Sequence, residues 1–242
     1  MKFERTNTWG FDHTIHGMRN PLASWDRSDS GYGCKKENKV CNTCPSINSE
    51  YEYGLCRSDI YIIGPNDMKL AQRLIKAGPE HRKFLRQIFV SVDITAPLYW
   101  WKEFDTYKVG TTANSTSTMH KLATTPITME CFECDDLAKD LVVYEKEPYD
   151  VDTTLEEFFQ YYLEALEALR ERFNKTKDKR YWKELVRLLP ESWLQTRTVT
   201  MNYEIIRNIV KQRAGHKLTE WKAFIDWAHT LPYADELIFY EL

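Results

Sequence analysis

Hydrophobic and polar residues alternate along one central stretch of the chain. The alternation covers residues 88–95 and predicts a strand with one buried face. Ala96 and Pro97 should end this strand, because proline cannot donate a hydrogen bond to a neighbouring strand. An aromatic-rich segment follows at once and predicts a helix over residues 98–107.

The remaining pattern mixes short strands with helices that gather toward the C-terminus. Strands are predicted at 60–63 and 141–144, and a short helix or turn at 17–26. Asn66 or Asp67 is expected to cap a helix that Gly78 ends. Thr154 and Glu157 match a capping box at the start of the longest predicted helix, 155–174, and three shorter helices are predicted at 181–188, 201–213 and 219–231. This order predicts an α+β fold, with a central antiparallel or mixed sheet, in a single domain over residues 1–242.

A loop of small hydroxyl residues follows the aromatic helix. Residues 110–118 read GTTANSTST, and His120 and Lys121 come directly after them. Backbone N–H groups and a cation in such a loop could hold a phosphate. The alternative is a plain polar loop without a ligand.

The charge balance and the hydropathy pattern limit the classes of partner. The chain has 33 basic and 36 acidic residues and a formal net charge of -3, which argues against general nucleic-acid binding. No apolar run approaches the roughly 18 residues that a membrane helix needs. The first residues also lack the apolar stretch of a secretory signal, so the sequence predicts a cytoplasmic protein.

Cysteines concentrate in a segment at about 34–57, whose polar composition indicates an insertion. The four thiols are Cys34, Cys41, Cys44 and Cys56. In a cytosolic protein such a cluster more often binds metal than forms disulfides, and four thiolates suit tetrahedral zinc or an iron–sulfur cluster. Free thiols and disulfides are the alternatives. Cys131 and Cys134 form a second closely spaced pair, for which spare thiols are the simpler interpretation.

The C-terminal third carries a Leu-Pro pair at residues 189–190, an asparagine at 202 and an arginine at 213. This arrangement resembles the flavin-dependent thymidylate synthases (ThyX). In that family a Leu-Pro segment leads to an asparagine on a helix, and an arginine follows eleven residues later. Leu189–Pro190, Asn202 and Arg213 stand at these positions here. Ala96–Pro97 matches the family's Ala-Pro before the aromatic helix, and His81 falls on a family histidine. The resemblance covers roughly residues 60–120 and 150–240.

The family's Arg-His-Arg motif is altered in this chain. The positions of that motif and of the serine that follows it are held by Thr106, Tyr107, Lys108 and Thr116. Ser117 and Thr118 replace the family's next Gly-Arg pair, and Glu103 replaces a glutamine. Lys121 could stand in for the missing arginine, although a lysine lacks the bidentate fork of a guanidinium group.

The resemblance implies a specific chemistry. The family is homotetrameric and binds FAD and dUMP; the reduced flavin delivers a hydride to the uracil ring, methylenetetrahydrofolate supplies the carbon, and NADPH reduces the flavin. It implies Arg213 as the catalytic residue along the uracil edge. The cofactor-binding residues it implies are His81, Lys108 and Asn202. The substrate-binding residues it implies are Thr116, Ser117, Thr118, Lys121 and Arg213.

Simpler roles stand beside these assignments. Arg213 would also offset a helix dipole, Asn202 would also cap a helix, and His81 would also serve packing. Two other functions are carried forward: a catalytically inactive ThyX-like nucleotide-binding or interaction protein, and a metalloprotein whose cysteine insertion carries the function. A conventional cysteine-dependent thymidylate synthase places its nucleophile in Pro-Cys-His, whereas Cys44 is followed by Pro45.

Overall fold

The structure, a computed structural model, describes residues 1–34, 39–40, 60–145 and 152–242. It has the predicted mixed α+β composition, with sheets flanked by helices and a helical C-terminal region. The described chain forms two compact units. The first contains Met1–Glu4, Asp93–Thr106 and Ala113–Val199, and the second contains Arg5–Val92, Tyr107–Thr112 and Thr200–Leu242. The single domain over residues 1–242 stays a prediction.

The largest sheet has four strands in the order β1-β5-β9-β6. Their bounds are Lys2–Trp9 for β1, Phe89–Pro97 for β5, Leu194–Asn202 for β9 and Thr112–Ser115 for β6. Strand β5 confirms the central prediction, because alternate residues such as Val90, Val92 and Ile94 are buried. Pro97 ends the strand, and α3 (Leu98–Phe104) begins at the next residue.

The hydroxyl-rich segment departs from its prediction as a loop. Residues Thr112–Ser115 form the edge strand β6, in which every side chain is exposed. Thr116 continues the pairing, since its backbone N–H donates to the carbonyl oxygen of Thr196 at 2.9 Å. A strand without a buried face shows no hydrophobic alternation, so its pairing with β9 was invisible in the local sequence.

The described flanks of the cysteine-rich segment form a three-stranded antiparallel sheet in the second unit. Its order is β3-β2-β4, with β3 at Lys39–Val40, β2 at Gly31–Cys34 and β4 at Ile60–Ile62. Strand β4 confirms the strand predicted at 60–63. Cys41, Cys44 and Cys56 lie outside the described residues, and so does most of the predicted insertion.

Helices form most of the second unit. They are α1 (Phe11–Arg19), α2 (Pro65–Lys76), α7 (Tyr203–Arg213), α8 (Thr219–His229), the 3-10 helices Asn20–Leu22, Trp25–Arg27 and η5 (Arg82–Gln87), and the π-helix η7 (Ala234–Ile238). Helix α7 is central, because it contacts η5, α8 and η7. Its apolar residues Ile206 and Ile209 are fully buried, as is Trp221 on α8.

Two predicted helix starts in the second unit were wrong. At 17–26, where a short helix or turn was predicted, the structure has the end of α1 followed by two 3-10 helices, and α1 itself begins at Phe11, after Gly10 turns the chain with a φ of 98°. The residue that precedes α2 is Gly64, so neither Asn66 nor Asp67 is its cap. Helix α7 begins at Tyr203 instead of residue 201, because β9 runs through Asn202.

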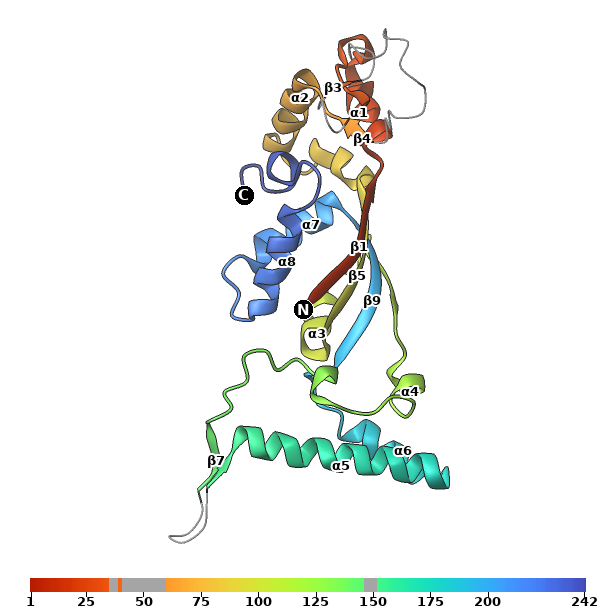
Figure 1. Ribbon diagram of the computed structural model, residues 1–242. Helices are drawn as coiled ribbons and strands as arrows, with labels where there is room; N and C mark the ends of the chain where they lie inside the picture. Colours follow the sequence, from red (N-terminus) through yellow and green to blue (C-terminus); the bar gives the residue numbers. More distant parts are fainter. Residues whose placement is uncertain (35–38, 41–59, 146–151) are drawn as a thin grey trace. The chain divides into compact units, whose positions relative to one another are not determined.

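The first unit is built around two packed helices. Helix α5 (Leu155–Thr176) lies beside α6 (Lys179–Arg187), as Figure 1 shows. The capping box at Thr154 and Glu157 is confirmed, with both reciprocal hydrogen bonds present. The unit also contains α4 (Thr118–Lys121), the 3-10 helix Met129–Cys131, and the strand pair β7 (Val142–Tyr144) and β8 (Thr153–Thr154). Its core consists of Leu122, Ile127, Phe132, Leu163, Leu166 and Leu185.

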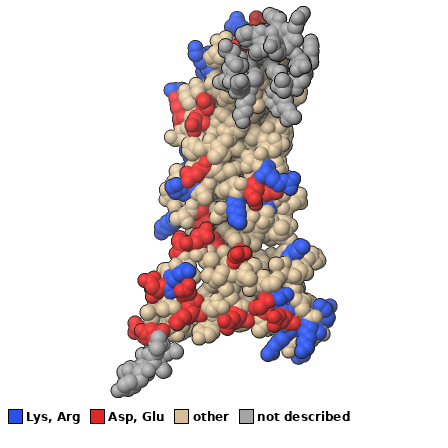
Figure 2. Space-filling view, viewed as in Figure 1, with Lys and Arg blue, Asp and Glu red and all other residues tan. Residues whose placement is uncertain are grey.

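Charged side chains of both signs share the surface. Figure 2 shows acidic and basic residues intermixed on the face in view. Among the described residues, no helix combines the length and the apolar character that a membrane span requires.

Candidate functional site

Helix α7 carries two of the predicted site residues, one at each end. Asn202 is the N-cap residue and is 8% exposed; its side-chain oxygen accepts a hydrogen bond from the backbone N–H of Ile205 at 3.1 Å. Arg213 is the last residue of the helix. A rise of 1.5 Å per residue puts their backbones roughly 16 Å apart along the axis. These two residues therefore lie at opposite ends of the same helix.

The loop Tyr107–Thr112 links the two ends of α7 within the same unit. At the C-terminal end, the Tyr107 hydroxyl donates to Oε1 of Gln212 at 3.2 Å. At the N-terminal end, Gly110 approaches Ile205 and Asn202 so closely that an added Cβ would lie 2.8 Å from Cδ1 of Ile205. The loop Tyr107–Thr112 is thus held against α7 at both ends of the helix.

The Arg213 guanidinium group is oriented by aromatic side chains. Its Nε donates to the Tyr107 hydroxyl oxygen at 2.9 Å, and Nη1 lies 3.1 Å from Nε2 of His216. The guanidinium carbon is 4.4 Å from the centre of the Trp221 ring and 5.5 Å from that of Tyr107. Such contacts keep the charge while fixing the plane of the group. The neighbouring side chains therefore hold the Arg213 guanidinium group in one orientation.

A tight turn closes the other end of the loop. The Thr111 N–H donates to the carbonyl oxygen of Lys108 at 3.3 Å, and Gly110, at the third position of this turn, has a φ of 75°. The Thr111 hydroxyl is buried and makes no hydrogen bond with any described residue. Buried hydroxyl groups are normally paired, so this oxygen is a candidate contact for a bound molecule. Lys108 is exposed at the start of the turn.

We expect Gly110→Ala to destabilise the protein more than Gly215→Ala does. Both glycines have a left-handed φ, 75° and 72°. An alanine in this backbone conformation costs roughly 1–2 kcal/mol at either position. A Cβ at Gly110 additionally meets Ile205, whereas a Cβ at Gly215 meets nothing within 4 Å. Because Cδ1 is the terminal atom of a partly exposed side chain that can shift, the additional loss should be smaller than the roughly 1–3 kcal/mol of overpacking in a closed core. Urea unfolding of the two variants measures the difference, and equal losses would contradict the close approach of the loop to α7.

His81 lies in a different part of the second unit, between α2 and η5. It is exposed and lines a cavity of about 580 Å³. Lys83 and Arg86 also line this cavity together with the acidic Glu80, and Met18 and Phe84 contribute apolar surface. The cavity therefore combines charges of both signs with apolar walls.

The predicted phosphate-binding residues belong to the first unit. Thr116 uses its N–H in the pairing with Thr196, and its carbonyl oxygen accepts from Nε2 of Gln195 at 2.9 Å. Ser117 caps α4, where its hydroxyl accepts from the His120 N–H at 3.3 Å. Thr118 and Lys121 begin and end that short helix, and Lys121 is exposed. The proximity of this segment to Arg213 stays a prediction, because the two lie in different units.

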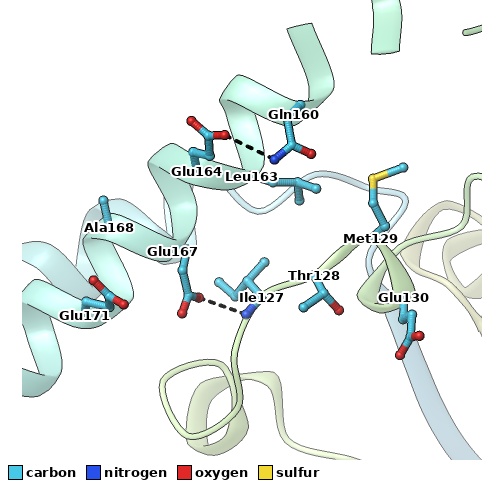
Figure 3. Close-up of a pocket in the computed structure, with 10 residues that line it drawn as sticks. All are labelled: Ile127, Thr128, Met129, Glu130, Gln160, Leu163, Glu164, Glu167, Ala168 and Glu171. Atoms are coloured by element: carbon cyan, nitrogen blue, oxygen red, sulfur yellow. Dashed lines mark hydrogen bonds between the residues drawn. The ribbon is translucent and has the colours of Figure 1, made fainter. Parts of the chain in front are cut away.

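A cavity of about 670 Å³ in the first unit holds none of the predicted residues. Figure 3 shows it between α5 and residues 127–130, with several glutamates along one side. Glu167 accepts from the backbone N–H of Ile127 at 2.9 Å and is paired with Arg170, whose hydrogen bonds lower the pKa of the carboxyl group. Gln160 donates to Glu164 at 3.2 Å. Glu167 therefore holds the helix against the neighbouring loop, and the carboxylates along this cavity do not suit an anionic substrate.

The described residues do not support a metal centre. No group of three or more His, Cys, Asp or Glu side chains with a suitable arrangement occurs among them. Cys131 and Cys134 form no disulfide, and the Cys134 thiol lies 3.8 Å from the carbonyl oxygen of Met129. The prediction for Cys34, Cys41, Cys44 and Cys56 concerns residues that lie largely outside the described part of the chain.

The candidate site at α7 (called the α7 site below) consists of Asn202, Arg213 and their neighbours Tyr107, Thr111, His216 and Trp221. The four neighbours have no predicted role. Tyr107 appeared only as a departure from the family motif, and Thr111 only as part of a polar loop. His216 and Trp221 follow Arg213 in the sequence, but their spacing from Arg213 matches no motif or periodic pattern. The available signal was the aromatic and histidine content just after Arg213, which cannot by itself distinguish a site from a core.

Comparison with known proteins supports the fold. No family model and no curated protein matches the sequence. Two solved structures of the flavin-dependent thymidylate synthase ThyX from Helicobacter pylori, both with FAD and dUMP, are similar over 99% of this chain and 98% and 97% of theirs. Their TM-scores are 0.62 and 0.61, each at 15% sequence identity. The chain therefore has a ThyX-like fold.

Proposed function

We propose that this protein is a flavin-dependent enzyme that transfers a one-carbon unit to C5 of a pyrimidine nucleotide, dUMP or a related molecule. One observation carries the proposal: Asn202 and Arg213 lie at the two ends of α7, and one loop, Tyr107–Thr112, contacts both ends. The fold that presents them is the fold of the Helicobacter pylori enzyme, whose structures contain FAD and dUMP.

We expect residues of the second unit to bind FAD. In the cavity beside His81, Lys83 and Arg86 would attract the diphosphate against the opposing charge of Glu80, and the apolar walls would contact a ring. The buried Thr111 hydroxyl lacks a hydrogen bond with the described residues, and Asn202 uses its side-chain oxygen in the cap. His81, Lys108 and Asn202 would hold the flavin, which supplies the hydride when it is bound.

Arg213 would hold the uracil ring of the nucleotide. Its positive charge would offset the negative charge that develops on the ring. Because Tyr107 and Trp221 already orient the guanidinium group, it would not have to reorganise during the reaction. Hydroxyl groups of Thr116, Ser117 and Thr118, with the Lys121 ammonium group, would bind the phosphate. Methylenetetrahydrofolate would supply the carbon and NADPH the reducing equivalents.

The proposed enzyme is a cytoplasmic homotetramer with sites shared between subunits. A shared site would bring the substrate-binding segment Thr116–Lys121 of one copy to the α7 helix of another.

A second candidate function is nucleotide binding without catalysis. Tyr107 stands where the ThyX family has the histidine of Arg-His-Arg and donates and accepts hydrogen bonds at the α7 helix. Thr106 and Lys108 lack the guanidinium groups of the flanking positions. These replacements weaken the case for transfer chemistry while leaving Asn202 and Arg213 in place.

Titration with FAD and dUMP, followed by an assay, separates the two functions. The protein should retain yellow FAD after gel filtration removes the free flavin. It should show a higher melting temperature with dUMP than with ATP, and it should release tritium from C5-labelled dUMP when methylenetetrahydrofolate and NADPH are added. Binding of both ligands without tritium release supports the second function. A protein that binds neither FAD nor dUMP contradicts both.

A further inference from the structure

A second cavity in the second unit is walled by aromatic rings. It measures about 620 Å³ and lies where β1 meets α1, next to β4 and the residues before η7. Five aromatic side chains line it, namely Trp9, Phe11, Tyr32, Tyr61 and Tyr233. It shares no lining residue with the cavity beside His81 or with the α7 site. Its size is in the range of small-molecule sites.

The aromatic pairs that line the cavity meet at steep angles. Tyr32 and Tyr61 meet edge to face with centroids 5.4 Å apart and planes at 86°. Phe11 and Tyr233 are arranged similarly, at 5.8 Å and 71°. Trp9 is 42% exposed and Tyr32 is 52% exposed, which is unusual for side chains with so much apolar surface. Walls at right angles form a cage instead of a flat stacking platform.

The only fully charged group among the described lining residues is acidic. Asp12 is exposed at the start of α1 and forms no ion pair with another described residue, and the described lining residues include His13 but no Lys or Arg. Its field reaches the aromatic walls: burial raises the pKa of Tyr61, and the Asp12 carboxylate raises it further. The cavity therefore favours positive charge and disfavours anions such as nucleotides.

The walls are fixed before a ligand binds. Tyr233 adopts a left-handed conformation with a φ of 54°, which is strained for a residue with a large side chain. Its hydroxyl oxygen accepts from the Ile63 N–H at 3.1 Å, and the hydroxyl donates to the carbonyl oxygen of Tyr61 at 3.2 Å. These two bonds tie the wall before η7 to β4. Strain of this kind persists where the surrounding structure imposes it, often at a binding site.

We propose that this aromatic cage binds a small organic cation of the alkylammonium class. The faces of the rings would attract the cation, and Asp12 would offset its charge at the rim. The proposal is independent of the flavin and nucleotide chemistry assigned to the α7 site.

Calorimetric titration with choline, and with its neutral isostere in which carbon replaces the quaternary nitrogen, tests the proposal on the full chain. Choline should bind about tenfold more tightly than the isostere, because only the cation gains from the ring faces. Tyr32→Leu keeps an apolar side chain but removes the ring face, and Asp12→Asn removes the charge. Each should weaken choline binding about tenfold and leave binding of the isostere unchanged.

Tyr161→Leu is the matched control, since Tyr161 is an aromatic residue 68% exposed in the first unit and should not affect binding. Equal affinity for choline and the isostere, or no binding of choline at all, overturns the proposal. Unchanged choline affinity in both Tyr32→Leu and Asp12→Asn also overturns it. A melting temperature close to that of the unsubstituted protein verifies that each variant is folded.

Discussion

Arg213→Ala should weaken dUMP binding about 100-fold, which corresponds to about 2.7 kcal/mol at room temperature. The loss is large because hydrogen bonds to a charged group are stronger than those between neutral groups. Arg213→Lys should recover only part of the affinity, since lysine keeps the charge but loses the planar fork and the stacking on Trp221. Calorimetric titration of FAD-loaded protein with dUMP measures both variants.

Lys211→Ala is the control for this experiment. Lys211 lies on the same helix, is exposed, and should leave dUMP affinity unchanged. Arg213→Ala should also lower the melting temperature slightly, because cation–π contacts with Tyr107 and Trp221 are lost at about 0.5–1 kcal/mol each. Unchanged dUMP affinity together with a large loss of stability would show that Arg213 is structural and would remove the main support for the proposed function.

Asp67→Ala should lower the free energy of unfolding by about 3–5 kcal/mol, because it leaves a buried cation without its partner. The Asp67 side chain is fully buried, and Nε of Arg19 donates to its Oδ1 at 2.5 Å. The hydroxyl groups of Ser28 and Ser30 donate to the other carboxylate oxygen at 2.7 and 2.6 Å. Urea unfolding at neutral pH measures the loss.

The same carboxylate predicts a pH dependence of stability. Burial acts to raise the pKa of Asp67, but hydrogen bonds from Ser30 and Ser28 and the pairing with Arg19 lower it overall. A lowered pKa in the folded state means that the stabilisation is complete above the unfolded pKa of about 3.9 and is lost as the pH falls through the folded value. Between neutral and strongly acidic pH, the free energy of unfolding of Asp67→Asn should therefore fall less than that of the unsubstituted protein.

An exposed ion pair provides the comparison for Asp67. Asp226 is paired with Lys222 one helical turn away, and both side chains are more than half exposed. Asp226→Asn should change stability by less than about 1 kcal/mol and should leave the acid dependence intact. Equal effects at Asp67 and Asp226 would contradict the buried network.

Prediction from sequence succeeded where structure depends on neighbouring residues. The alternation at 88–95 identified β5, and the capping box at Thr154 and Glu157 identified the start of α5. In both cases the signal lies within a few positions, because strand periodicity and helix capping are local. The resemblance to ThyX, which depended on residue spacing around Asn202 and Arg213, also predicted the fold that the structure has.

Prediction was incomplete where a segment depends on a distant partner. Strand β9 had a weak signal, with threonines alternating with Val199 and Met201, and residues 194–200 were not predicted as a strand. Strand β6 had none, because every side chain in it is exposed. Asp67 illustrates the same limit: its position favoured a helix cap, but Arg19 and the serines before β2 surround it and bury it.

The sequence by itself determined the α+β class, the bounds of β5 and α5 to within a few residues, and the candidates Asn202 and Arg213. Only the tertiary structure decided that Tyr107 and Trp221 orient Arg213, that Gly110 packs against α7, and that five aromatic side chains surround a cavity near Asp12. The physical reason is the range of the interactions. Periodicity and caps act over one or two helical turns, whereas the contact between Tyr107 and Arg213 joins residues 106 positions apart and exists only once the chain has folded back.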